Sequence, residues 1–242
     1  TTIVVAAVAV VMLTGSPGPV AADISVQEMV NRVESDRPRD PATDAVNFLP
    51  AVLGQDLRPG DGLKTYDASE ARVDIVVGSS SRITRTKPNT LWRLGQFALE
   101  EDTIIELKRG RVFLFDDADG TAPRPIKIIT PAGTAFPRST WMSFAYDPVT
   151  EEAELQCFRG TCVFENDFGT QVLVDEQKST ATVETAPEEP LGMTSEETLV
   201  FEGLPEVKTG EVIIPTVEPS NPTTSPTQTP PATTPPPSLT TA

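Results

Sequence analysis

Short apolar runs, each bounded by residues that favour turns, divide the sequence between Val46 and Val183. The runs recur about every ten residues without a long helical period, which is typical of antiparallel β proteins. Apolar and polar residues alternate at Arg72–Ile75 and Ile105–Lys108, so these strands present one face to a core. We therefore expect an all-β fold, an antiparallel two-sheet sandwich that resembles a jelly roll. The expected strands are Ala71–Val77, Arg82–Thr86, Leu91–Leu94, Thr103–Lys108, Arg111–Phe115, Ile126–Thr130, Ser139–Tyr146, Glu152–Phe158, Thr161–Glu165 and Gln171–Val174.

The first 22 residues differ from the β region. Ile3–Leu13 is an apolar run, and the small residues of Val20–Ala22 follow at the spacing that a signal peptidase accepts. The run is too short to cross roughly 30 Å of hydrocarbon as a helix. We interpret residues 1–22 as a signal peptide. The end of a membrane anchor stays open as an alternative, because the chain begins without Met or a basic region.

The composition changes again after Val183. Residues 184–214 are an acidic segment, in which Thr194 and Glu197 fit a capping box and predict a short helix at Ser195–Glu202. Residues 215–242 are mostly Pro, Thr and Ser, which bury too little apolar surface to offset the entropy of ordering. We interpret this segment as a disordered linker or stalk and a plausible target of O-glycosylation.

Histidine is absent from the sequence. Its absence excludes Ser-His-Asp and Cys-His catalytic systems, sites in which His ligates zinc, iron or haem, and cupin-type metal sites. The net charge of −16 argues against duplex DNA or an anionic membrane as a partner. The stretch from Arg82 to Lys127 is locally basic. We attribute this pattern to alternating charges on exposed strand faces rather than to a binding patch.

Six motifs occur in the order found in the FecR domain, which the chain resembles from about Ala45 to Thr182. The first, Leu57–Thr65, is similar to the opening L-x-x-G-D-x-L-K-T of that domain. The other five are Ala71–Ser79, Pro88–Leu91, Leu107–Phe113, Thr130–Gly133 and Leu155–Val163. The resemblance implies a FecR-like β domain at residues 45–183. Within residues 23–44, the resemblance implies a strand, although Val26, Met29, Val30 and Val33 have helical spacing, and the Pro and Asp content of residues 36–44 predicts a loop.

The chain departs from the family at two motifs and at both ends. Val77–Ser79 stands where the family often has D-G-S, and Arg138–Met142 stands where it commonly has R-G-T-x-F. Family members that regulate sigma factors have a cytoplasmic anti-sigma segment, a membrane span and a domain that contacts an outer-membrane transporter. Here a signal-like peptide and a Pro/Thr-rich tail flank the domain instead. We therefore keep a signal-transducing regulator of the iron-uptake type as the alternative function.

Cys157 and Cys162 lie on either side of Arg159–Gly160. If that dipeptide is the turn of a hairpin, the cysteines form a cross-strand pair with Cβ atoms about 4.5–5.5 Å apart, close to disulfide reach. A structural disulfide is the expected state in an exported protein. A redox pair would more typically have C-x-x-C spacing, and a two-Cys metal site has no His to complete it.

Three other patterns have structural explanations. Asp116–Gly120 lacks the further oxygen ligands that a calcium loop needs, and Phe115 stands where its first Asp would be, so a hairpin turn is favoured. Lys64–Thr65 has the wrong spacing for a phosphate-binding loop. Trp92 and Trp141 lie within strand patterns, so core positions are favoured over stacking on sugars.

These observations predict a non-enzymatic module that is secreted, periplasmic or on the cell surface. It would bind a protein or glycan of the cell envelope, without nucleic acid, and with the membrane only if the N-terminal segment is an uncleaved anchor. We assign no catalytic, cofactor or metal residues, and only the pair Cys157 and Cys162 as a disulfide. A carbohydrate-processing enzyme is a weaker alternative, since no pair of carboxylates is singled out.

Overall fold

The computed structural model describes residues 22–36, 47–77, 80–97, 102–116 and 125–209. The signal-peptide segment up to residue 21, residues 117–120 of the Asp-rich loop and the Pro/Thr-rich tail lie outside the described residues. No helix among the described residues is long and apolar enough to cross a membrane.

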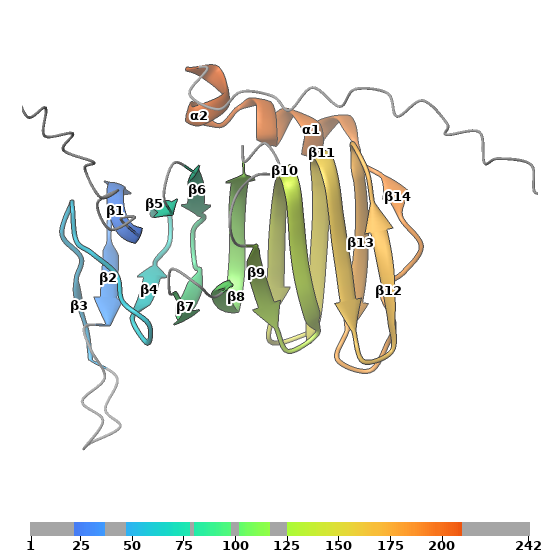
Figure 1. The fold of residues 1–242 in the computed structure, drawn as a ribbon, viewed down its shortest axis with the longest axis horizontal. Coiled ribbons are helices and arrows are strands. Elements are labelled where there is room, and N and C mark those ends of the chain that lie inside the picture. Colours follow the sequence, from blue (N-terminus) through green and yellow to red (C-terminus); the bar gives the residue numbers. More distant parts are fainter. Residues whose placement is uncertain (1–21, 37–46, 78–79, 98–101, 117–124, 210–242) are drawn as a thin grey trace, which may run out of the picture.

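The described residues form strands and two short helices, so the predicted all-β class is confirmed. The strands are β1 Ala22–Val30, β2 Val33–Asp36, β3 Phe48–Pro50, β4 Gly62–Thr65, β5 Glu70–Val77, β6 Ser80–Thr86, β7 Leu91–Gln96, β8 Thr103–Asp116, β9 Ile126–Thr130, β10 Gly133–Asp147, β11 Glu152–Asn166, β12 Gly169–Leu173, β13 Gln177–Thr182 and β14 Leu191–Gly192. The helices are α1 Ser195–Glu202 and α2 Pro205–Lys208. Figure 1 shows β8 to β13 standing side by side, with α1 across one end of them and α2 above β6.

The described strands belong to one continuous sheet, in the order β14-β13-β11-β10-β9-β8-β7-β4-β2-β3, with branches to β1-β5-β6 and to β12. Three long strands, β8, β10 and β11, change partners halfway along their length. The first half of β8 pairs with β7 and β9, and the second half pairs with β6 and β10. In β11, the first half pairs with β13 and the second half with β12. The predicted two sheets are therefore two layers of one sheet, joined by bent strands.

The expected strands are separated at Arg109–Gly110 and at Arg159–Gly160, and both breaks are wrong, because each dipeptide lies inside one strand, β8 or β11. Gly110 and Gly160 have φ angles of +86° and +89°, which bend the strands without ending them. A Cβ atom at Gly160 would lie 2.5 Å from the carbonyl oxygen of Ser139, and one at Gly110 would lie 2.6 Å from the Cα of Thr90. Glycine is favoured at positive φ both in a hairpin turn and in a bend within a strand, so the sequence alone does not distinguish the two.

The N-terminal segment is a strand, as the family resemblance implies, and the helical spacing is misleading. β1 pairs with β5 in antiparallel register, with Val26 opposite Val73 and Glu28 opposite Arg72. Gln27 is left over between them, so it forms a bulge that reverses the alternation along β1. The bulge explains why the apolar residues do not follow a period of two. Through β1 and β2, this segment joins the same sheet as the later strands.

The main core lies between the two layers and includes Trp92. A second cluster lies where α1 and α2 pack on strands, and it contains Ile83, Phe113, Phe115, Trp141, Phe158, Phe201 and Leu204. The ring centroid of Phe201 on α1 is 4.8 Å from those of Phe113 and Phe158. Both Trp side chains are buried, with exposed fractions of 1% for Trp92 and 0% for Trp141, so the predicted core positions are confirmed.

Helix α1 has the bounds and the capping box that the sequence predicts. Thr194 is its N-cap, and its side chain accepts a hydrogen bond from the backbone N–H of Glu197, while the Glu197 carboxylate accepts one from the N–H of Thr194. Helix α2 is not predicted, because four residues are too few to show a helical period. Strands β3, β4, β13 and β14 are also absent from the prediction, and three of them have four residues or fewer.

Candidate functional site

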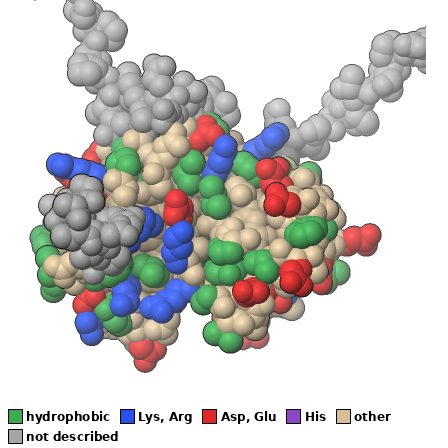
Figure 2. All heavy atoms as spheres, turned by 90° about the horizontal axis from the view of Figure 1, so that it is seen from below, with side chains coloured by type: hydrophobic (Ala, Val, Ile, Leu, Met, Phe, Trp, Pro, Cys, Tyr) green, Lys and Arg blue, Asp and Glu red, His purple; other side chains and the backbone are tan. Residues whose placement is uncertain are grey.

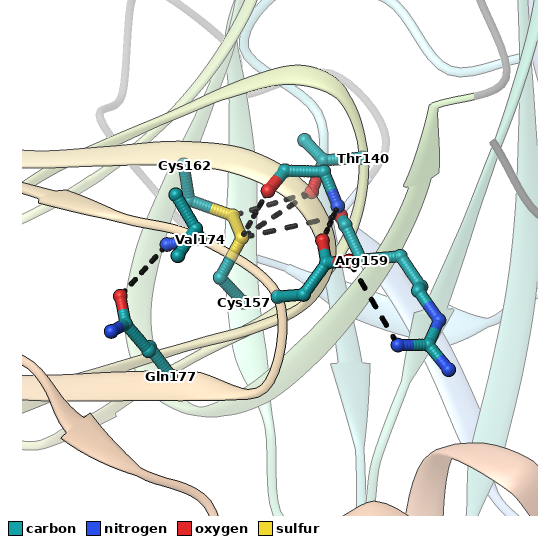
Figure 3. Close-up of a disulfide and its surroundings, with 8 residues drawn as sticks. Thr140, Cys157, Arg159, Cys162, Val174 and Gln177 are labelled. Atoms are coloured by element: carbon teal, nitrogen blue, oxygen red, sulfur yellow. Dashed lines mark hydrogen bonds and ion pairs between the residues drawn. A yellow bond between two sulfur atoms is a disulfide. The ribbon is translucent and has the colours of Figure 1, made fainter. Parts of the chain in front are cut away.

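A disulfide joins Cys157 to Cys162 across the bend of β11 (Figure 3). Cys157 lies in the half of β11 that pairs with β13, and Cys162 lies in the half that pairs with β12. In the predicted hairpin the two halves would be hydrogen-bonded to each other. In the structure they pair with different strands, so the disulfide links the two layers of the sheet. Both side chains have an exposed fraction of 0%. Since thiol chemistry needs access to solvent, this burial favours a structural role.

Neighbouring elements hold the bend of β11 in place. The hydroxyl of Thr140, on β10, lies 3.2 Å from the sulfur of Cys162 and 3.8 Å from that of Cys157. The backbone N–H of Gly160 donates to the carboxylate of Asp175 at 2.7 Å. The Arg159 guanidinium forms an ion pair with Glu176 at 3.2 Å. The disulfide is therefore one part of a fixed corner rather than an isolated link.

Most cations of the basic stretch have carboxylate partners. The pairs are Arg82 with Asp116, Arg85 with Glu206, Lys87 with Glu70, Arg93 with Asp36, Lys108 with Glu106, Arg111 with Glu154, and Lys127 with Asp102. Arg82 and Arg85 are buried, so the expectation of exposed strand faces does not hold for them. These partners cancel most of the local positive charge. Arg109 differs, because it is exposed and has no ion pair within the part of the chain that the structure describes.

Arg109 lies at the rim of an open groove of about 670 Å³, which we call the end groove. Three segments far apart in sequence surround it. They are the turn between β6 and β7, the bend of β8, and the turn between β10 and β11 with the start of β11. The lining residues are Pro88, Asn89, Arg109, Gly110, Arg111, Ala145, Tyr146, Asp147, Pro148, Val149, Glu152 and Glu154. No single stretch of sequence contains this groove, so it could not be predicted from a local pattern of residues.

The end groove combines opposite charges with an apolar side chain. Arg109 and Arg111 come from β8, whereas Asp147, Glu152 and Glu154 come from β10 and β11. Figure 2 shows the molecule from this end, with Lys and Arg more frequent on one half and Asp and Glu more frequent on the other. Val149 has an exposed fraction of 89%. Val149 is thus an exposed apolar side chain among charged residues, of which Arg111 and Glu154 form an ion pair at 2.6 Å.

Tyr146 contributes a polar group to the lining of the end groove. Its side chain is almost fully buried, and this burial raises the pKa of the phenol, with further increases from the negative charges of Glu151 and Asp147. The phenol therefore keeps its proton at neutral pH and can donate a hydrogen bond. A proton donor that resists ionisation suits recognition of a carbonyl or carboxylate oxygen better than it suits base catalysis near neutral pH.

The remaining carboxylates with shifted pKa values have structural partners. A hydrogen bond from the Tyr66 hydroxyl at 2.5 Å lowers the pKa of Glu34, burial opposes this effect, and Arg32 lowers it further. For Glu197, burial raises the pKa, but hydrogen bonds from Lys178 and Thr194 outweigh it and the net shift is downward. Among the described residues, no three Cys, Asp or Glu side chains lie close enough together to hold a metal ion.

Comparisons with known proteins identify no family. No model of a protein family matches the chain, and no curated protein matches it. Two crystal structures, at 2.50 Å and 1.65 Å resolution, are described as "a putative anti-sigma factor" from Parabacteroides distasonis. Each is similar with a TM-score of 0.47 and 8% sequence identity, over 58% of this chain and 63% of the other. This chain thus matches less than two thirds of the length of either neighbour, and the likeness is too weak to carry an argument about function.

Proposed function

We propose that this chain is a non-catalytic binding module of the cell envelope, which works outside the cytoplasm and contacts a partner protein through the end groove. The observation that carries the proposal is the groove itself. It is open, two turns and the bend of β8 form it, and it brings the exposed Val149 together with Arg109, Asp147 and Glu152. An open groove that combines Arg109, carboxylates and one exposed apolar side chain suits a protein loop, because charge placement sets the orientation of a docked partner.

A glycan is the less favoured ligand of the end groove. Sugars bind proteins largely by stacking on exposed aromatic rings, and both Trp side chains are buried in the two clusters. The only aromatic side chain in the groove lining, Tyr146, is 6% exposed. Hydrogen bonds from Arg109 and Tyr146 alone would leave a sugar ring without an apolar face to rest on.

The buried disulfide supports a location outside the cytoplasm. Disulfides persist in oxidising compartments, and reducing thiol systems make them rare in the cytosol. The order of motifs resembles that of the FecR domain, and this resemblance in sequence also supports a protein of the cell envelope. A signal-transducing regulator is the alternative reading of the same resemblance, and a partner that is a transporter or a sigma-factor regulator would favour it.

The experiment compares partner binding by groove variants with binding by a matched control. Immobilised full-length protein would be exposed to the envelope fraction of its source cells, and bound proteins identified by mass spectrometry. We expect Arg109→Glu and Val149→Asp to lose the partner, whereas Val52→Asp, at another exposed valine, retains it. With the purified partner, each groove variant should weaken binding by about tenfold or more. Equal binding by all variants would rule out the groove as the contact site.

A second measurement addresses catalysis. Elemental analysis of the purified chain and a screen of hydrolase substrates should give neither a stoichiometric metal nor turnover. Turnover that a single carboxylate substitution abolishes would overturn the non-catalytic part of the proposal. Partner binding and catalysis are thus tested separately.

A further inference from the structure

Strand β12 is the outermost strand of one layer of the sheet. It pairs with β11 alone, from Cys162 opposite Leu173 to Asn166 opposite Gly169. No other strand of the described residues pairs with its outer edge. Its inner face is covered, since Leu173 is buried and the Cβ of Ala186 lies near Gly169. The backbone groups along the outer edge are therefore placed to accept another strand.

The other terminal strands of the sheet have features that discourage pairing. β14 has only two residues, and β3 has three and ends in Pro50. The free side of β1 is occupied by the segment Gly54–Leu57, since Val26 donates to Gln55 at 3.0 Å and Leu57 donates to Ile24 at 2.8 Å. β12 has five residues, Gly-Thr-Gln-Val-Leu, with neither proline nor charge. Proteins normally protect an edge of this length with Lys, Pro or a bulge.

An apolar row on the outer face leads to this edge. Phe136 on β10 lies opposite Val163 on β11, and Val163 lies opposite Val172 on β12. Val172 has an exposed fraction of 55%, and Val174, just beyond the strand, has one of 49%. The row ends at the edge with its last side chain half uncovered. A strand added there with an apolar residue opposite Val172 would continue it.

We infer that β12 is the pairing edge for a second copy of this chain, joined antiparallel about Val172. In this register the Val172 side chains of the two copies face each other, and Thr170 of each copy faces Val174 of the other. The row then runs without interruption through Phe136, Val163 and Val172 of both copies. This symmetric arrangement is closed, because the same surface is used twice.

Charge does not oppose a second copy at this strand. Each chain has a net charge of −16, so two copies repel each other wherever acidic residues meet. Residues 168–174 contain no charged side chain, and the nearest are Asp167 and Asp175. A five-residue strand pair buries a small area, so we expect weak, reversible association. Because the copies carry like charges, added salt should strengthen it, whereas a basic partner would bind less tightly in salt.

Sedimentation velocity of the full-length protein measures the association directly. We expect a dimer whose fraction rises with protein concentration and with salt from about 50 mM to about 500 mM. Val172→Lys should raise the dissociation constant by about tenfold or more, because it places a charge on the paired face. Val30→Lys is the control, since Val30 is a strand valine of similar exposure on β1. A protein that stays monomeric throughout, or that dimerises equally well as Val172→Lys, would overturn the inference.

Cysteine cross-linking tests the register without relying on a destabilised variant. The native cysteines are both in the disulfide, so a new cysteine is the only free thiol. Under mild oxidation Val172→Cys should form a covalent dimer, because opposite Cβ atoms in such a pair lie about 5 Å apart. Thr170→Cys should not, since the two Thr170 positions would be roughly 13 Å apart along the strands. Equal cross-linking of both variants, or of neither, would contradict antiparallel pairing about Val172.

Discussion

Arg85 on β6 and Glu206 on α2 form a two-point ion pair although 121 residues separate them in sequence. The Nε of Arg85 lies 2.8 Å from one carboxylate oxygen of Glu206 and 3.0 Å from the other. Their side chains are 3% and 0% exposed, and Glu28 adds a second acceptor at 2.9 Å. Burial lowers the pKa of Arg85, but the hydrogen bonds from Arg85 to Glu206 and Glu28 outweigh it, so the net shift is upward. The pair fastens α2 to the sheet.

Glu206→Gln should therefore destabilise the protein by about 1–3 kcal/mol, because it leaves a buried guanidinium with weaker partners. Glu28→Gln is the control, since Glu28 is 48% exposed and contacts the same arginine. We expect its effect to stay below about 1 kcal/mol. Urea unfolding of both variants measures the difference, and equal effects would mean that burial of the pair does not matter.

Replacing both cysteines with alanine should cost about 2 kcal/mol, because the bond closes a short loop and constrains the unfolded chain only modestly. The variant should still fold, since the main core and the layer pairing stay in place. Thermal unfolding gives the loss of stability. Intact mass without reductant tests the bond itself, and two free thiols in the wild-type protein would contradict it.

Gly160→Ala should cost about 2–4 kcal/mol, because alanine would be both strained at positive φ and too close to Ser139. Gly54→Ala separates these two causes. Gly54 has a φ of +73° but nothing within 4 Å of its Cβ position, so only the backbone strain of about 1 kcal/mol remains. A similar loss in both variants, measured by urea unfolding, would show that the close packing at the β11 bend contributes little.

The capping carboxylate of Glu197 makes the free energy of unfolding depend on pH in the acid range. Its pKa is lowered in the folded state, so its contribution is present above the unfolded value of about 4.3 and is lost as pH falls through the folded pKa. Glu197→Gln should therefore be less stable than wild type at pH 7, by about 1 kcal/mol, with the difference disappearing once the pH falls below the lowered pKa of the folded state.

Urea midpoints across this pH range measure the effect of Glu197. Glu196→Gln is the control, since Glu196 is an exposed neighbour in the same helical turn. A difference that is constant with pH would mean that the ionised carboxylate is not the stabilising form.

The sequence alone determined the features that depend on neighbouring residues. Alternation along the chain predicted most of the longer strands, and the capping box placed α1 at its observed bounds. The cysteine spacing predicted a disulfide through a hairpin turn at Arg159–Gly160, and the bond is present although that dipeptide is a bend within β11. Each of these features depends on residues that are close in sequence, so it forms in much the same way whatever the rest of the fold.

Tertiary structure decided whether a glycine becomes a turn or a bend. Gly110 and Gly160 could each end a strand, and only the pairing of β8 and β11 with strands on both sides keeps the chain extended through them. The end groove and the ion pair of Arg85 with Glu206 are of the same kind, since their members lie far apart in sequence. Such contacts depend on how the two layers pack over the core, and this packing cannot be predicted from the pattern of residues along the chain.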